Sequence, residues 1–271
     1  CPSCGRLVSV SEPKCPYCGR VRPGMFGFLG FFQKIGRDAA FPSIAMGLCA
    51  ALYGFSLLFD PSGIGSGGML SFLSPSGAAL LAFGASGAWP TFGQGHWWTL
   101  LSAGWLHGSL LHLVFNMMWL RDLGPEVATL YGASRMIVIY TVASVTGFAA
   151  SSAMGYLLPG VPFVGGAVVT VGASAAIFGL LGALVAYSRR GGSRNLGKQA
   201  WTWAIGLFIV GLIMPRVDNW AHLGGFVGGL LASKFLDPLK EERADHTVMA
   251  LVCLLATVGS IVMSLWMSRS L

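Results

Sequence analysis

Seven apolar stretches, each about as long as a bilayer is thick, restrict this sequence to a membrane fold. A helix needs about 20 mostly apolar residues to cross the hydrocarbon core, where water cannot satisfy backbone polar groups. Composition agrees, since 10% of residues are charged, 54% are hydrophobic and the mean hydropathy is +0.69. We therefore predict an all-α polytopic membrane protein. Its seven transmembrane helices are expected at residues 42–59, 98–120, 136–158, 170–188, 198–214, 219–236 and 247–267.

The distribution of Lys and Arg predicts which way these helices cross. Cytosolic loops of membrane proteins carry an excess of these residues. If the N-terminus is cytosolic and seven helices follow, fifteen of the 17 basic residues lie inside or at the inner end of a helix, and only Arg216 and Arg269 lie outside. We therefore expect a cytosolic N-terminus and an external C-terminus. The net charge of +7 then serves orientation and contact with the lipid bilayer, and no nucleic-acid partner is expected.

Ser174 and His222 are polar residues within otherwise apolar stretches. Such groups are costly in a bilayer and usually face a partner or a water-filled cavity. Ser174 precedes the basic inner end at Arg189 by fifteen residues, and His222 precedes Lys234 by twelve, or about 22 and 18 Å of helix. The similar depth allows a Ser-His pair. Close packing of the two stretches is favoured by small faces at Gly172, Gly179, Gly182, Gly225 and Gly229.

Three short motifs occur in order on three of the predicted helices. They read His107-x4-His112-x3-Asn116, Gly172-Ala173-Ser174 and Ala221-His222-x2-Gly225-x3-Gly229. A further set of residues lies in the second loop and third helix, at Glu126, Gly132, Arg135 and Tyr140. Together these residues resemble the rhomboid family of intramembrane serine proteases. The resemblance covers roughly residues 40 to 236 and implies a rhomboid-like six-helix core, to which the chain adds a C-terminal seventh transmembrane helix.

The resemblance implies a role for each matching residue. Ser174 would be the nucleophile and His222 the general base, with no carboxylate as a third member. His112 and Asn116, one helical turn apart on the same face, would flank the oxyanion together with the Ser174 backbone N–H. The implied enzyme is a serine endopeptidase that cleaves transmembrane or juxtamembrane segments of membrane protein substrates. No cofactor is required for this catalysis.

Two more positions have roles implied by the resemblance, and two depart from the family's pattern. Gly172 would allow a tight turn and a close approach of the substrate, and Phe178 would stack its ring on the catalytic histidine. Thr99 follows Trp98 where the family often has Arg, so an arginine that orders the first external loop is absent. Ala175 stands where Gly is usual, and its methyl group is expected to narrow the substrate approach. Neither departure removes a catalytic atom, so activity is still expected.

Two other functions fit parts of the same pattern. A rhomboid-like pseudoprotease would keep the fold and bind membrane clients without cutting them, so it would be indifferent to Ser174→Ala. A membrane redox or transport protein could instead use His112 and His222 as haem or metal ligands. Labelling by a serine-directed probe, or a metal at those histidines, would separate these readings.

The N-terminus carries a cysteine pattern typical of a zinc module. CPSCG and CPYCG give C-x2-C-x10-C-x2-C, and the four thiolates at Cys1, Cys4, Cys15 and Cys18 can surround one Zn²⁺. Four cysteines leave no position for water, so the metal would be structural. The reducing cytosol disfavours disulfides at these positions. The sequence therefore divides into a zinc-ribbon-like module (1–20), a juxtamembrane linker (21–41), the catalytic core (42–236), and a linker with the additional helix (237–271). A cytosolic partner is expected for the module.

Overall fold

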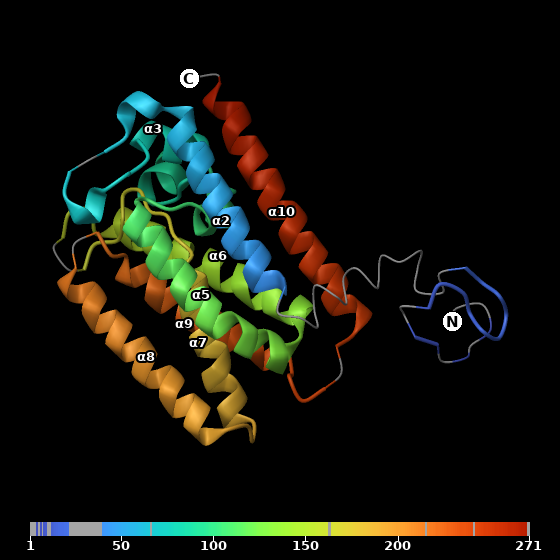
Figure 1. Cartoon of the computed structure of the whole chain (residues 1–271). Helices are drawn as coiled ribbons and strands as arrows, with labels where there is room; N and C mark the ends of the chain where they lie inside the picture. Colours follow the sequence, from blue (N-terminus) through green and yellow to red (C-terminus); the bar gives the residue numbers. More distant parts are fainter. Residues whose placement is uncertain are drawn as a thin grey trace.

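The computed structural model describes residues 4, 6, 8–9, 12–21, 40–65, 67–161, 164–214, 216–240 and 242–269. In these ranges the chain forms seven long helices, so the all-α prediction is confirmed (Figure 1). Short turns and the six-residue helix α3 (Gly77–Ala82) fill the connection that follows the first long helix. The long helices are α2 (Ala40–Phe59), α5 (Leu110–Tyr131), α6 (Ala133–Leu157), α7 (Ser174–Arg189), α8 (Arg194–Ile213), α9 (Asn219–Phe235) and α10 (Ala244–Ser268).

Four of these helices, α2, α6, α8 and α10, are long and apolar enough to cross a membrane. The other three do not meet this criterion, since α7 has 16 residues, α9 has 17, and α5 carries Arg121, Asp122 and Glu126. The prediction of seven helices is therefore confirmed, whereas only four of them have the length and composition of a span. For α7 the reason is its place in the bundle, because a helix enclosed by other helices needs small residues more than lipid-like ones, whereas α9 buries one face and exposes Leu223, Val227 and Leu231 on another.

Helix α7 forms the centre of the bundle. Every residue from Ala175 to Ala186 is buried, and α7 packs extensively on α9 and α6. A Cβ atom on Gly225 would collide with the carbonyl oxygen of Ala175, and one on Gly229 would collide with the backbone of Gly179. The close approach expected from the glycines is therefore present, and it fixes the register of α9 on α7. Van der Waals contact between backbones is a main source of helix association in membranes.

The second predicted span, residues 98–120, is wrong in its limits. Residues 99–105 form two short turns, α4 (Thr99–Ser102) and a 3-10 turn (Ala103–Trp105), and the long helix α5 begins only at Leu110. Ser109 sets this start, since its Oγ accepts the N–H of His112 at 3.3 Å. Apolar residues before α5 moved the predicted start of this span too early. Charged residues in the second half of α5 moved its predicted end too early. His107 therefore precedes the helix that carries His112.

Helix α10 is attached to the bundle near both of its ends. Ser260 donates its hydroxyl to the carbonyl oxygen of Trp98 at 2.7 Å, and the Trp98 indole N–H donates to Ser264 Oγ at 3.0 Å. At the other end Arg135, which is 2% exposed, donates to two carbonyl oxygens of the α9–α10 connection, at 2.7 and 2.8 Å. The additional C-terminal helix is thus hydrogen-bonded to Trp98 near one end, and the connection that leads into its other end is bonded to Arg135 at the start of α6.

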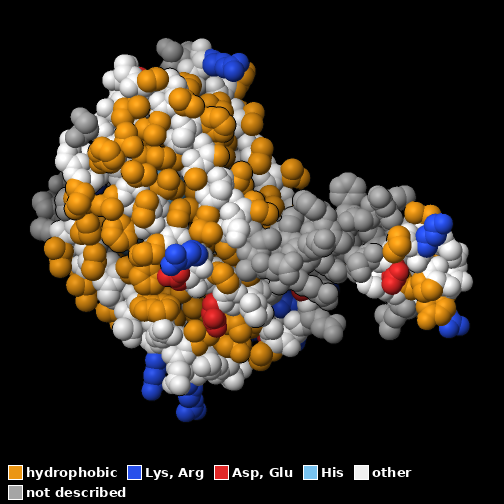
Figure 2. Space-filling view, viewed as in Figure 1, with side chains coloured by type: hydrophobic (Ala, Val, Ile, Leu, Met, Phe, Trp, Pro, Cys, Tyr) orange, Lys and Arg blue, Asp and Glu red, His pale blue; other side chains and the backbone are white. Residues whose placement is uncertain are grey.

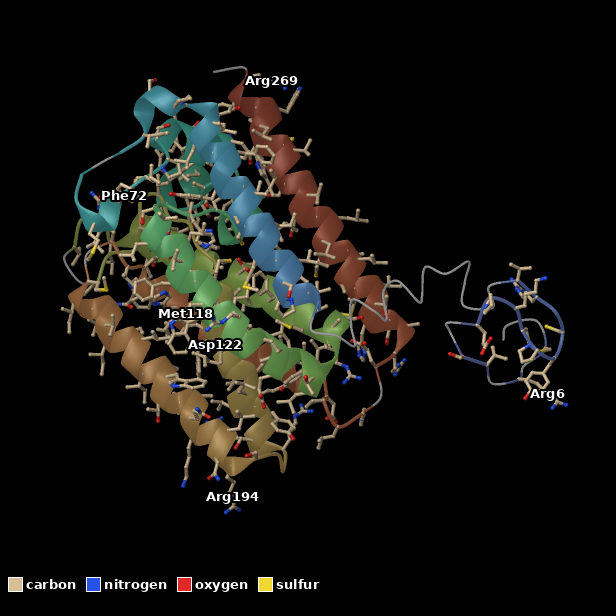
Figure 3. All side chains as sticks on the ribbon, in the orientation of Figure 1. Arg6, Phe72, Met118, Asp122, Arg194 and Arg269 are labelled. Atoms are coloured by element: carbon tan, nitrogen blue, oxygen red, sulfur yellow. The ribbon has the colours of Figure 1, made fainter. Side chains whose placement is uncertain are left out.

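The surface of the bundle is mainly apolar. Figure 2 shows hydrophobic side chains over most of the visible face, while several Lys and Arg side chains project near one end. Arg194 at the start of α8 and Arg269 after α10 lie at opposite ends of the bundle (Figure 3). An apolar belt between polar ends is what a bundle in a bilayer presents. Which end faces the cytosol stays a prediction.

Candidate functional site

Ser174 is the first residue of α7 and is half-buried. The segment before it turns at Gly172, whose φ of +136° lies in a region that L side chains rarely adopt. The Gly172 N–H donates to the carbonyl oxygen of Ala103 at 3.0 Å, which ties this turn to the short helices before α5. A Cβ on Gly172 would lie 2.7 Å from Nε2 of His112 and 3.8 Å from Oγ of Ser174. Glycine is thus needed here both for its backbone conformation and for space, and the turn brings His112 and Ser174 to one point.

His222 lies in the first turn of α9 and is 6% exposed. Its ring stacks on Phe178 of α7, with ring centroids 4.2 Å apart and planes 11° apart. The contact between Gly225 and the Ala175 carbonyl places this turn of α9 beside the start of α7. In the described part of the chain, His222 Nδ1 is buried and has no hydrogen-bond partner. The imidazole is therefore held by stacking beside the start of α7 and has a ring nitrogen not committed elsewhere.

His112 and Asn116 come from the first half of α5. The N–H of Gly108 donates to His112 Nδ1 at 3.3 Å, so the neutral ring carries its proton on Nε2, the nitrogen that faces Gly172. Asn116 donates one amide N–H to the carbonyl oxygen of His112 at 2.8 Å, and its second N–H remains available. The structure thus brings an N–H donor of His112 to the turn before Ser174, while the Asn116 side chain bonds to its own helix.

Thr99 and Ala175 are the two positions that depart from the family's pattern. Thr99 is 2% exposed and donates its hydroxyl to the carbonyl oxygen of His96 at 2.7 Å, so its side chain stabilises the turn between residues 96 and 99. Ala175 is 1% exposed, and its Cβ would be 2.7 Å from a Cβ placed on Gly147 of α6. The expectation that the Ala175 methyl narrows the substrate approach is therefore wrong, because this methyl group packs into the helix interface.

The sequence did not point to Asp218 and Ser151, which lie beside the candidate site. Asp218 precedes α9 and caps it, since its Oδ1 accepts the N–H of Ala221 at 3.0 Å. Its other oxygen accepts the hydroxyl of Ser151, on α6, at 2.5 Å. The spacing of Asp218 four residues before His222 was a usable indication, but nothing in the sequence paired it with a serine 67 residues away.

Three of the four predicted zinc ligands converge in the N-terminal module. The sulfur atoms of Cys4, Cys15 and Cys18 all lie within 4.8 Å of one another, and those of Cys4 and Cys15 are 3.8 Å apart. Tetrahedral Zn²⁺ with bonds of about 2.3 Å requires sulfurs about 3.8 Å apart, so the described thiols fit the metal. Cys1 lies outside the described residues, as do residues 22–39 of the juxtamembrane linker.

The backbone around Cys15 also suits a metal knuckle. The Cys15 N–H donates to the carbonyl oxygen of Arg20 at 2.9 Å, and Gly19, with a φ of +72°, closes the turn. Burial acts to raise the pKa of the Cys15 thiol, but hydrogen bonds from the backbone N–H groups of Tyr17 and Cys18, together with those from the Cys18 and Cys4 thiols, outweigh it and lower that pKa to about 7. A thiol that readily loses its proton is suited to bind a metal as thiolate.

Comparison with known proteins agrees with this arrangement. A model of the rhomboid domain matches residues 94–239, more than half of the chain. The chain is 36% identical over 180 residues to the rhomboid protease GluP of Bacillus subtilis (strain 168), covering 65% of this chain and 33% of that protein. In Arabidopsis thaliana it is 31% identical to RHOMBOID-like protein 4 over 163 residues, covering 59% and 39% of the two chains. It is 35% identical to RHOMBOID-like protein 5 over 140 residues, covering 50% and 43%.

The fold and these matches define a polytopic, all-helical membrane protein. The chain belongs to the rhomboid family. It spans 33% to 43% of the lengths of these three relatives, one of which is named as a protease and two as rhomboid-like proteins.

Proposed function

We propose that this protein is an intramembrane serine endopeptidase that cuts transmembrane or juxtamembrane segments of other membrane proteins. The observation that carries this proposal is the convergence of His112 of α5 and His222 of α9 on the first turns of α7. There Ser174 lies beside the His112 ring, and Phe178 of the same helix stacks on His222. A hydroxyl and an imidazole in one partly buried site can perform nucleophilic catalysis without a metal or a carboxylate.

In the proposed reaction, Ser174 Oγ attacks the carbonyl carbon of the scissile peptide while His222 takes the hydroxyl proton. The carbon–nitrogen bond then breaks, and His222 returns that proton to the leaving amine. Water attacks the resulting ester with His222 again as base, which releases the acid and restores Ser174. Stacking on Phe178 supports this role because it fixes the plane of the imidazole.

The negative charge that develops on the substrate oxygen needs hydrogen-bond donors. The Ser174 N–H is available because the first N–H groups of a helix have no partner within it. His112 supplies its Nε2–H and Asn116 its second amide N–H. Donors of this kind are worth about 3 to 4 kcal/mol each in the barrier when they are fixed in a site that excludes bulk water.

A transmembrane substrate must also unwind, since a helix hides the carbonyl groups that Ser174 would attack. We therefore propose substrates with small or polar residues that weaken their helix near the cleavage site. The alternative of a haem or metal protein has less support. A relative at 36% identity is named as a rhomboid protease, which favours peptide cleavage over haem or metal binding at His112 and His222.

The test is covalent labelling of the purified protein by a serine-directed phosphonate, together with cleavage of a model transmembrane substrate. Ser174→Ala should abolish both readouts, and His222→Ala should reduce both to background. Ser188→Ala is the matched control, because it removes a hydroxyl from the other end of α7. Cleavage that survives Ser174→Ala would overturn the proposal. A wild-type protein that binds the substrate but neither cleaves it nor reacts with the phosphonate would indicate a pseudoprotease.

We further propose that the N-terminal module holds one structural zinc ion and faces the cytosol, where a protein partner would contact it. The support is the convergence of Cys4, Cys15 and Cys18 at distances that suit tetrahedral zinc. The excess of basic residues on the side assigned to the N-terminus supports the orientation. No step of the proposed peptide cleavage involves this metal.

A further inference from the structure

The first turn of α9 holds the chain that leads to Ser174. We call residues 164–173, which connect to the start of α7, the approach segment. The Trp220 indole N–H donates to the carbonyl oxygen of Val164 at 2.7 Å. Ser151 of α6 accepts the N–H of Ala167 at 3.2 Å and donates its hydroxyl to Asp218 Oδ2 at 2.5 Å. The turn that carries His222 is thus joined to the approach segment at two points.

The approach segment is fixed on its other side as well. Ser86 and Thr170 exchange two backbone hydrogen bonds, at 3.1 and 2.7 Å, and the Ala88 N–H donates to the carbonyl oxygen of Ala167 at 2.9 Å. A Cβ on Gly166 would collide with the carbonyl oxygen of Ser151, so the segment lies directly on α6. A shift of the segment at Ala167 would therefore be transmitted along a short, constrained chain to Ser174.

The Ser151 hydroxyl bonds to both elements at once, as donor to the Asp218 carboxylate and as acceptor of the Ala167 N–H. Ser151 is 0% exposed, so water cannot replace either bond. Hydrogen bonds to a carboxylate are shorter and stronger than those between neutral groups, and a bond of 2.5 Å is in that range. Helix capping does not require this second bond, because the capping N–H is accepted by the other oxygen, Oδ1.

We propose that Asp218, acting through Ser151, is a positioning residue that fixes the approach segment against α9. It thereby sets the place of Ser174 relative to His222. The catalytic consequence rests on the proposed function, whereas the structural connection does not. The carboxylate touches neither the substrate nor the reacting atoms, and its effect comes from joining the two elements that carry the nucleophile and the base.

The first measurement is amide hydrogen exchange of residues 164–171 in the full-length protein in detergent. Ser151→Ala removes the shared hydroxyl and leaves the Asp218 cap intact. Asp218→Asn keeps the cap, since Asn caps as well as Asp, but it turns an N–H donor toward Ser151 in place of an acceptor. Both variants should raise exchange of the segment about tenfold, the equivalent of one lost hydrogen bond. Ser144→Ala is the control, because Ser144 is buried on α6 and its hydroxyl has no partner among the described residues.

The second measurement is cleavage kinetics of the same variants. Each single variant should lower kcat about tenfold with KM within twofold, since misplacement of reacting groups affects the chemical step. The double variant should be no worse than either single one, because both remove the same connection. Unchanged exchange in Ser151→Ala, or a double variant that loses about 100-fold in kcat, would overturn the proposal. If the wild-type protein does not cleave while exchange behaves as expected, the proposed function fails and the connection stands.

Discussion

The central and the peripheral helices use glycine in opposite surroundings. A Cβ on Gly179 or Gly225, in α7 and α9, would collide with atoms of a neighbouring helix. A Cβ on Gly54, Gly206 or Gly259, in α2, α8 and α10, would meet nothing within 4 Å. At these positions glycine permits close contact at the centre and has no packing role at the periphery, although Gly211 of α8 also lies in contact, with Asn219. Helices in a membrane associate through such close contacts, because lipid is as apolar as their side chains and provides little hydrophobic driving force for association.

Burial separates the two groups, whereas hydropathy does not. The most apolar windows of α10 and α8 are each 22% buried but have hydropathies of 2.4 and 1.4, whereas that of α6 has 1.6 and is 67% buried. The place of a helix in the bundle therefore cannot be read from its hydropathy alone. Enclosed helices can carry polar groups, since their neighbours shield these groups from the hydrocarbon. Ser174 and His222 lie on the two shortest long helices, α7 and α9, and both are at least partly buried there.

The contrast between central and peripheral glycines is tested most sharply by replacing one glycine of each kind by alanine. Gly225→Ala places a methyl group against the Ala175 carbonyl oxygen and must push α9 away from α7. Overpacking of this kind costs about 1 to 3 kcal/mol or more, and displacement of the reacting groups should lower cleavage at least about 100-fold. Thermal unfolding in detergent and the rate of substrate cleavage measure the two effects.

Gly259→Ala is the matched control for this substitution. Its methyl group meets open space on α10, and replacing glycine by alanine in a helix stabilises it by up to about 1 kcal/mol. Cleavage should be unchanged and the unfolding temperature equal or higher. Equal losses at both positions would show that the distinction between central and peripheral glycines has no energetic meaning in this protein.

A second prediction concerns polar groups on α5 near the centre. His112→Ala and Asn116→Ala should each lower kcat about 100-fold with little change in KM, because their donors act on charge that forms in the transition state. Asn195→Ala, at the exposed start of α8, should change neither constant. If Asn116→Ala matches this control, its side chain serves only the hydrogen bond to the His112 carbonyl oxygen.

Much of the fold was predictable from the sequence, because long apolar runs have few alternatives to helix in a bilayer. The motifs around Ser174 and His222 also predicted that α7 and α9 lie together, and the glycine contacts agree. What failed was the start of the second helix. Hydropathy cannot distinguish short buried helical turns, such as residues 99–105, from the beginning of a long apolar helix, and the Ser109 cap marks where the long helix starts.

Other features were not predictable because they depend on which residues meet in three dimensions. The Ala175 methyl group was expected to narrow the substrate approach, but its direction is set by the register of α7 against α6. Ser151 is one of several small polar residues in α6, and its link to Asp218 follows only from the packing of α6 on α9. The bonds between α10 and Trp98 likewise depend on the path of a connection that has no regular period in the sequence.

A third prediction tests a peripheral contact with hydroxyl groups. Replacing Ser260 and Ser264 by Ala removes both hydrogen bonds between α10 and Trp98, each worth about 1 kcal/mol. Amide exchange of residues 96–103 should rise, while cleavage should fall by no more than about threefold, because α10 does not touch the candidate site. Ser268→Ala, whose hydroxyl bonds only within its own helix, is the control. A loss of cleavage as large as that of Gly225→Ala would mean that the periphery controls the centre.

The smallest effect on the core is expected from the N-terminal module. Purified protein should contain about one zinc per chain, and replacing Cys15 and Cys18 by Ser should release it and unfold the module, since binding energy of a structural zinc is folding energy. The proposed catalytic residues lie on α5, α7 and α9 and include none of these thiols, so cleavage of a model substrate should stay within about twofold of wild type. Replacing Cys253 of α10 by Ser is the control, because it removes a thiol without touching the module.

Metal content, exchange of residues 12–21 and cleavage rate are measured on the same samples. Loss of cleavage together with zinc, in protein whose helices remain folded, would show that the module is coupled to the catalytic core.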